Sequence, residues 1–191
     1  MSGINIGDFE YRKFFNDGTN TFVRTQDIMW DISQGNVSGM KMYTIPGRKD
    51  SISATVLDDV TQVPSTTVIP SPGGIQLEVV SSSGDDVSVG DGTGVQQVDI
   101  HYLDTDGAEQ TEIVIMAGAT PVNTVATDID FVQWMHSSVV GTGGVAAGNI
   151  SLRNTAGTVT YEYIAAGGNQ SLSARVKVPA GKTGYIMGWQ G

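Results

Sequence analysis

The sequence predicts an all-β protein: an antiparallel β-sandwich or jelly roll of about eight or nine strands, preceded by an extended N-terminal arm. Side chains alternate between apolar and polar in many short runs, turn dipeptides separate these runs, and Gly, Val, Thr and Ser are abundant. The runs follow one another at roughly 12-residue spacing, which is typical of sandwich folds. The sequence contains no internal repeat of the kind that builds solenoids or propellers.

The clearest strands lie between residues 75 and 116. Apolar side chains there recur at every second position, which places them on one face of a strand. The dipeptide Asp106-Gly107 separates the second run from the third, and Asp-Gly is a strong signal for a β-hairpin. We therefore expect three antiparallel strands, whose alternating residues are Ile75, Leu77 and Val79, then Val98, Ile100 and Tyr102, then Glu112, Val114 and Met116.

Further runs continue the pattern toward the C-terminus, at residues 119–125, 128–140, 149–154, 159–163, 172–178 and 183–189. The run at 128–140 is the longest, and it carries bulky side chains on both parities. Such a strand is either buried on both sides or in contact with a neighbouring subunit. In the second case the subunit-interface candidates are Phe131, Gln133 and Met135.

Residues 1–72 differ in character, and we predict that they form an arm and connector before a domain at residues 73–191. No strand or helix period persists in the first part, yet its apolar content is too high for a segment that stays disordered. The prolines at 64, 70 and 72 make the end of this region poor material for a central strand. The arm's aromatic residues either anchor it on another protein or complete the domain's own core: Phe9, Tyr11, Phe14, Phe15, Phe22 and Trp30.

The net charge of −10 is distributed unevenly along the chain. Residues 1–49 carry six basic and five acidic residues, residues 50–152 carry fourteen acidic and no basic residues, and residues 153–191 carry four basic and one acidic residue. Because an acidic body repels nucleic acid and anionic membranes, neither is an expected partner. The acidic surface either keeps the protein in solution or faces solvent while the near-neutral first 49 residues lie against a partner.

Targeting and redox signals are absent from the sequence. No apolar run approaches the roughly 20 residues that span a bilayer. The first residues lack the apolar core of a secretion signal, so we expect synthesis in the cytoplasm. Cysteine is absent, so neither disulfides nor thiolate metal ligands are available.

Acidic residues around the Asp106-Gly107 turn are the strongest candidate for a chemical site. Asp104, Asp106 and Glu109 follow one another there as the first oxygen ligands of a calcium loop do, but the remaining ligands of such a loop are missing. We predict a structural turn, with cation binding as the alternative. The same interpretation applies to Asp85, Asp86 and Asp91 in the preceding loop.

Other patterns do not indicate an enzyme. The glycine-rich loops at 90–94 and 141–144 are not followed by the helix that phosphate-binding motifs require. His101 and His136 occupy strand positions, and nothing in the pattern points to a nucleophile or base beside them. We expect no catalytic activity and no cofactor.

Several short motifs occur in a fixed order: LEVVSSS at 77–83, GTG at 92–94, TEIVIMAGATPV at 111–122, AGNI at 147–150 and VPAGKTGYI at 178–186. In this order they resemble structural proteins of tailed bacteriophages. The resemblance covers roughly residues 75–188, about 60% of the chain, and it is strongest in the last motif.

The resemblance implies a virion component made in the host cytoplasm. Within that class we favour a capsid decoration (cement) protein on the capsid surface, which is a β-sandwich or jelly roll, is commonly a homotrimer, and binds the major capsid protein. Trimeric closure would also bury edge strands. The acidic domain suits an outer surface, and the aromatic-rich arm suits clamping the capsid protein.

Two other classes remain open. A tail or fibre-attachment protein would also be rich in β-structure and oligomeric. A carbohydrate-binding module is the further alternative, because jelly rolls often bind glycans, and Trp134 and Trp189 are the candidate contacts.

Overall fold

The computed structural model describes residues 12–16, 21–25, 28–52, 54–55, 60–63, 73–90 and 92–188. The chain divides into two compact units, Met1–Thr44 and Ile45–Gly191. Residues 45–63, which the sequence suggested to be part of an arm and connector, thus belong to the same unit as the predicted domain. Within the described residues no helix is long and apolar enough to cross a membrane.

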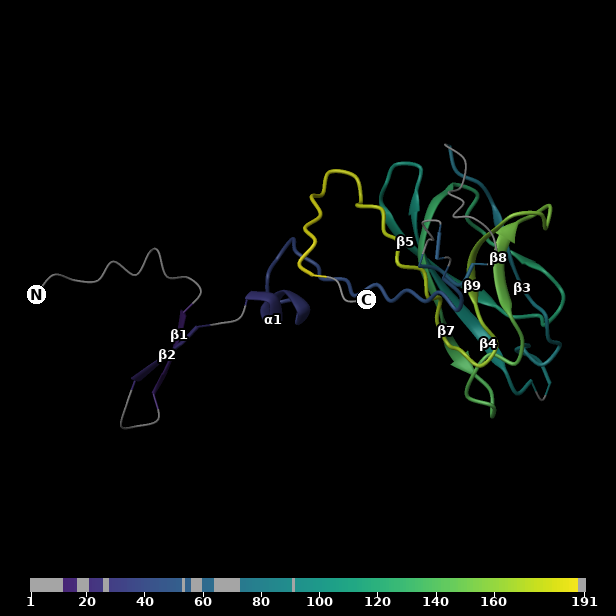
Figure 1. The fold of residues 1–191 in the computed structure, drawn as a ribbon, viewed down its shortest axis with the longest axis horizontal. Helices are drawn as coiled ribbons and strands as arrows, with labels where there is room; N and C mark the ends of the chain where they lie inside the picture. The colour runs from purple at the N-terminus through teal and green to yellow at the C-terminus, as the bar shows by residue number, and fades with distance from the viewer. Residues whose placement is uncertain are drawn as a thin grey trace, which may run out of the picture. The chain divides into compact units, whose positions relative to one another are not determined.

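The first unit contains a short hairpin and a short helix (Figure 1). Strands β1 (Arg12–Asn16) and β2 (Thr21–Thr25) pair antiparallel, with Phe15 opposite Phe22. Helix α1 (Ile28–Ser33) ends in a turn in which the amide of Gly35, at φ 72°, donates to the carbonyl of Ile32 at 3.0 Å. Elements this short leave no lasting period in the sequence, which is why the pattern predicted only an extended arm.

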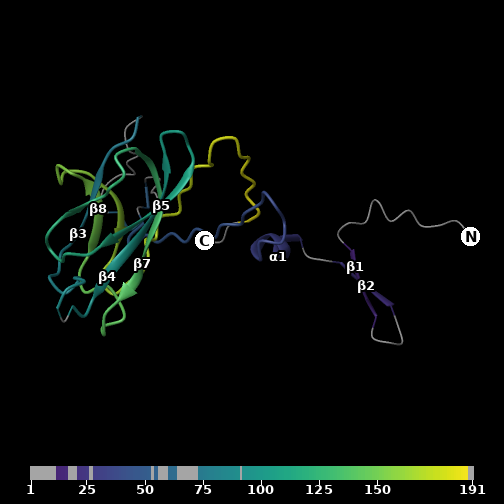
Figure 2. The same ribbon diagram turned by 180° about the vertical axis from the view of Figure 1, so that it is seen from behind.

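The second unit contains two antiparallel sheets, so the predicted all-β, antiparallel class is confirmed. The strands are β3 (Leu77–Ser81), β4 (Val95–Asp104), β5 (Glu109–Ile115), β6 (Val122–Asn123), β7 (Ile129–Val140), β8 (Ile150–Asn154) and β9 (Thr160–Ile164). One sheet has the order β6-β3-β8-β9, and the other has the order β5-β4-β7. In both views β3 and β8 lie on one side of this unit and β5 and β7 on the other (Figures 1 and 2).

The runs at 172–178 and 183–189 were predicted to be strands, but residues 172–178 and 183–188 have no strand structure, and residue 189 lies outside the described part. Residues 169–177 run along β7 through isolated contacts instead of a continuous ladder. Residues 181–188 are exposed, and the end of the chain leaves the sheets as an irregular trace (Figure 1). Of the alternating apolar residues Leu172, Val176 and Val178, only Leu172 packs inward, because Val176 and Val178 are exposed.

One apolar core joins the two sheets. Its fully buried members come from both, so each sheet covers the other's inner side chains. Burying a side chain of this size is worth about 1.5–3 kcal/mol relative to leaving it exposed. The largest of these residues are Leu77, Ile100, Met135, Ile150, Leu152 and Ile164.

The predicted subunit-interface residues are buried within the single chain. Phe131, Gln133 and Met135 lie on β7 and are covered by the chain's own residues. The amide group of Gln133 exchanges two hydrogen bonds with the backbone of Lys177, at 2.5 and 3.2 Å. A second subunit could reach these side chains only if that cover moved away, so their subunit contact stays a prediction.

Candidate functional site

Residues 169–177, which we call the seam segment, close the outer edge of β7. The amide of Ser171 donates to the carbonyl of Met135 at 2.9 Å, and the hydroxyl oxygen of Ser171 accepts from the amide of Met135 at 3.0 Å. The amide of Ser137 donates to the carbonyl of Asn169 at 2.8 Å. The seam segment therefore satisfies backbone groups that an edge strand would otherwise leave open.

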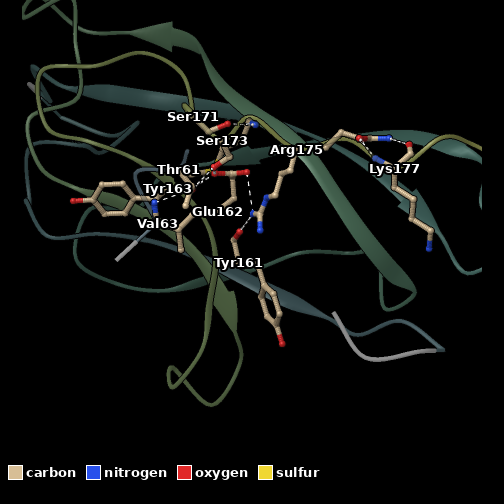
Figure 3. Close-up of polar contacts among 11 residues, drawn as sticks. Thr61, Val63, Tyr161, Glu162, Tyr163, Ser171, Ser173, Arg175 and Lys177 are labelled. Atoms are coloured by element: carbon tan, nitrogen blue, oxygen red, sulfur yellow. Dashed lines mark hydrogen bonds and ion pairs between the residues drawn. The ribbon is translucent and has the colours of Figure 1, made fainter. Parts of the chain in front are cut away.

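A buried carboxylate joins the seam segment to β9 (Figure 3). Glu162 is fully buried, and its Oε1 accepts from the hydroxyl of Ser173 at 2.7 Å and from the amide of Tyr163 at 3.1 Å. Its Oε2 accepts from the guanidinium of Arg175 at 3.1 Å. Arg175 also donates to the carbonyl of Tyr161, so these side chains close the edge of β9.

Burial sets the electrostatics of this cluster. Loss of solvation raises the pKa of Glu162, while the adjacent Arg175 charge and the three hydrogen bonds from Ser173, Arg175 and Tyr163 act in the opposite direction. A buried carboxylate of this kind is tolerated only with paired charge and donors, because an uncompensated one costs several kcal/mol by order of magnitude. The buried carboxylate of Glu162 therefore depends on the adjacent Arg175 charge to compensate its own.

Residues 47–48 and 60–62 pack against the same cluster from another side. The carbonyl of Leu172 accepts from the amides of Arg48 and Gln62 at 3.2 and 3.3 Å, and the amide of Ala174 donates to the carbonyl of Val60 at 2.9 Å. The hydroxyls of Thr61 and Ser173 lie 2.8 Å apart. Since Ser173 donates its proton to Glu162, Thr61 is the donor in this second bond.

Gly47 shows how close this packing is. A Cβ at that position would lie 2.5 Å from the Cβ of Ala174. Together with the buried Glu162, Ser173 and Thr61, this leaves the cluster closed to a reactant. The arrangement is suited to holding three parts of the second unit together and not to general acid–base chemistry, which requires contact with a substrate proton.

A second buried carboxylate, Asp86, organises the loop between β3 and β4. It accepts from the hydroxyl of Ser81 at 2.5 Å and from the amides of Val95, Ala147 and Gly148 at 2.7, 2.9 and 2.9 Å. These neighbours are hydrogen-bond donors, so they occupy the carboxylate oxygens and do not form an oxygen-ligand shell for a cation. Asp85 is exposed, and Asp91 lies outside the described residues.

The predicted turn at Asp104 has its carboxylate directed into the β4–β5 hairpin. Its Oδ1 accepts from the amides of Asp106 and Ala108 at 3.0 and 2.9 Å, and its Oδ2 accepts from the side chain of Gln110 at 2.9 Å. The bonds from Gln110 and then from Ala108 lower the pKa of Asp104. Asp106 and Glu109 are exposed, and no group of three acidic or histidine side chains among the described residues could hold a metal ion.

Three rings stack on the solvent-facing side of the β5-β4-β7 sheet. The centroid of His101 lies 4.4 Å from that of Trp134 and 5.3 Å from that of His136, with the planes 23° and 15° apart. Burial, and then the neighbouring His136, lower the pKa of His101. The carboxylate of Asp99 lies 4.0 Å from His136. The sequence placed both histidines on strands, but it did not show that the register pairs His101 with Trp134 and Asp99 with His136.

The structure describes the side chain of only one of the six predicted anchor residues, Trp30. Phe9 and Tyr11 lie outside the described residues, and Phe14, Phe15 and Phe22 lie on β1 and β2 with side chains that the structure does not describe. Trp30 on α1 is 64% exposed. Trp189, the second predicted glycan contact, is also outside the described residues. Among the residues of the first unit whose side chains the structure describes, the other large apolar residues that are exposed are Met40, Met42 and Tyr43.

Comparisons with protein-family models, with curated proteins and with solved structures gave no match to this chain.

Proposed function

We propose that this chain is a structural protein of a tailed-bacteriophage particle, a capsid decoration (cement) protein that binds and stabilises the major capsid protein lattice. In this proposal the second unit is a β-sandwich of the jelly-roll kind that faces solvent, and the first unit anchors it. The protein is not an enzyme. The proposal rests on the order of motifs between residues 75 and 188 and on what the buried polar groups are used for.

The hydrogen bonds accepted by the two buried carboxylates support the proposed structural role. Most of the hydrogen bonds that Glu162 and Asp86 accept join separate segments: Glu162 joins β9 to the seam segment, and Asp86 joins residues 81, 95 and 147–148. Buried polar networks of this kind rigidify one arrangement of the chain. Buried carboxylates that hold the chain in one arrangement, and do not react, are what we expect of a protein that stabilises an assembly.

The first unit supports the anchoring role. It exposes Trp30, Met40, Met42 and Tyr43, which are residue types enriched at the centres of protein interfaces. Residues 1–49 are close to neutral, whereas residues 50–152 contain fourteen acidic residues and no basic residue. A neutral, aromatic anchor and an anionic outer body are the properties that a surface-bound capsid protein needs.

The proposal is tested by the amount of the protein in purified particles. A stoichiometry close to that of the major capsid protein supports a lattice position, whereas a small copy number that matches the symmetry of the tail supports the tail or fibre-attachment alternative. Particles that lack the protein should lose their genome at lower temperature. Unchanged heat resistance of such particles contradicts the cementing role.

The anchor is tested by substitution of a single tryptophan. Trp30→Ala should weaken binding of the purified protein to capsids that lack it by at least about fivefold, which is the effect of losing an interface anchor worth more than about 1 kcal/mol. Trp134→Ala, a matched change in the second unit, should leave capsid binding unchanged. Equal binding by both variants contradicts an anchor at Trp30.

The ring stack favours a second candidate, carbohydrate binding. Trp134 and His101 present aromatic surface beside the polar side chains of Asp99 and Ser138, a combination found in glycan sites. A glycan array probed with the full chain tests this function. Binding that Trp134→Ala abolishes would support it, and the absence of any glycan signal removes it.

A further inference from the structure

The four sheet edges of the second unit differ in how far other residues of the chain cover them. The edge at β7 is closed by the seam segment, and the edge at β9 is closed by the side chains of Glu162 and Arg175. The edge at β6 is only two residues long. The remaining edge, β5, has seven residues and pairs with β4 alone. Among the described residues β5 is therefore the one long edge left open.

Hydrogen bonds at the two ends of β5 show which backbone groups face outward. The carbonyl of Ala108 accepts from Asp104 at 3.1 Å, and the amide of Met116 donates to Gln96 at 2.9 Å, so even-numbered residues point toward β4. Because direction alternates along a strand, Thr111, Ile113 and Ile115 direct their amides and carbonyls away from β4. No described residue outside the β4–β5 ladder makes a backbone hydrogen bond to these three residues.

β5 ends at Ile115, and beyond it Met116 and Gly118 direct their backbone groups to the same side as β4. The amide of Ser88 donates to the carbonyl of Met116 at 3.0 Å, and the amide of Gly118 donates to the carbonyl of Asp86 at 2.8 Å, which forms a bridge between Val87 and Ala117. A strand added at the outer side of β5 therefore pairs as far as Ile115, where β5 itself ends. The open part of the edge is residues 111–115.

The side chains on this edge are apolar and exposed. Ile113 is 57% exposed and Ile115 is 60% exposed, and both lie on the solvent-facing side of the sheet. Protected edges in natural proteins carry lysine, proline or a bulge, and residues 111–115 of β5 have none of these. The carboxylate of Glu112 accepts from the amides of Val125 and Ala126 at 2.5 and 3.0 Å, so its charge is compensated within the chain.

We propose that β5 pairs antiparallel with β5 of a second copy of this chain, with Ile113 on the two-fold axis. The three-stranded sheets of the two copies then form one continuous sheet. A two-fold contact is self-complementary and closes, whereas one open edge per chain provides no second surface with which to build a ring.

Charge selects this register among the possible ones. Centring the axis on Glu112 would place two carboxylates directly opposite each other, and like charges in that position are destabilising. Centring it on Ile113 pairs Ile113 with Ile113, Thr111 with Ile115 and Glu112 with Val114. No two acidic residues are then opposite each other, and the pairing covers residues 111–115, up to the end of β5.

The absence of cysteine from the chain allows a sharp test of the register. In the proposed pairing two Ile113 residues form a hydrogen-bonded pair with Cα atoms about 5.5 Å apart, within the roughly 4.4–6.8 Å that a disulfide spans. With an added oxidant, full-length Ile113→Cys should therefore form a covalent dimer nearly completely. Two Ile115 residues would lie about 14 Å apart along the strands, so Ile115→Cys is the matched control and should remain monomeric on a non-reducing gel.

The second test measures association without a cross-link. Light scattering of the purified full chain should give a dimer, and Ile113→Lys should give a monomer with an unchanged circular dichroism spectrum. A wild-type monomer, a trimer that Ile113→Lys leaves intact, or equal cross-linking of the two cysteine variants would each overturn the proposal. A monomer whose Ile113→Lys variant loses capsid binding would assign the edge to a different protein. Because the cross-linking and light-scattering measurements use the isolated chain, their outcome is independent of the proposed capsid role.

Discussion

The two outer edges of the β5-β4-β7 sheet differ in whether other residues of the same chain cover them. The β7 edge is closed by residues far away in sequence, since the seam segment supplies Ser171 to Met135 and Lys177 to Gln133. The β5 edge has exposed Ile113 and Ile115 and outward-facing backbone groups. The difference separates a part of the sheet that stabilises the single chain from a part that is available to a second one. Substitutions at the two edges should therefore affect different properties.

At the closed edges, the largest effect on stability should come from loss of the charge that supports them. Arg175→Met leaves the fully buried carboxylate of Glu162 without its partner, and breaking a buried ion pair from one side costs about 3–5 kcal/mol. The free energy of unfolding in urea measures this loss. Lys177→Met, a matched change at a half-exposed cation that pairs with Asp130, should cost no more than about 1 kcal/mol.

A double variant separates lost charge from lost packing. Glu162→Gln combined with Arg175→Met removes both charges and keeps an acceptor for Ser173 and Tyr163. It should recover most of the stability that Arg175→Met loses. A double variant as unstable as the single one would show that Arg175 acts through packing.

The pH dependence of the Arg175→Met variant should follow from Glu162. Burial raises the pKa of this carboxyl in the folded chain, and loss of Arg175 removes an opposing influence. Between the ordinary carboxyl pKa and the raised one, the folded state binds more protons than the unfolded state, so stability falls as pH rises. The deficit of Arg175→Met relative to wild type should therefore be smaller at pH 5 than at pH 8, and a deficit independent of pH would contradict this account.

The alternation of apolar residues predicted the strands of the second unit better than it predicted the closed edge. The Asp106-Gly107 hairpin and the inward residues of β3, β4 and β8 follow the two-residue period. Glu162 does not, because the period places it opposite Tyr161 and Tyr163, on the outward face. A register shift between Leu152 and Arg153 allows Tyr161 and Glu162 to be buried together. A bulge of this kind leaves no mark in the sequence.

The seam segment was also beyond sequence analysis. Its contacts join residues 45–63, β7 and β9 across long separations, so no local period reports them. A buried glutamate followed by an arginine thirteen positions later is compatible with many arrangements. Only the fold places Ser173 between Thr61 and Glu162.

A smaller loss is expected at the contact between residues 45–63 and the seam segment. Thr61→Val removes the hydroxyl that bonds to Ser173 and that accepts from the buried amide of Val63 at 3.1 Å. The unsatisfied amide should cost about 1–3 kcal/mol in urea unfolding. Thr111→Val, at an exposed hydroxyl on β5, is the control and should change stability by less than about 0.5 kcal/mol.

The smallest effect on the stability of the single chain should occur at the open edge. Ile113→Lys places a charge on an exposed strand position, where substitutions change the free energy of unfolding by about 0.5 kcal/mol or less. Val114→Lys, one residue further on, directs the same charge into the core next to Val98 and should prevent folding.

The stability of the dimer, in contrast, should depend strongly on Ile113, because a monomeric Ile113→Lys variant no longer gains stability from a partner. The melting temperature of wild type should therefore rise with protein concentration while that of Ile113→Lys stays constant. Identical concentration dependence in the two proteins would mean that the β5 edge, despite its exposure, does not hold the copies together.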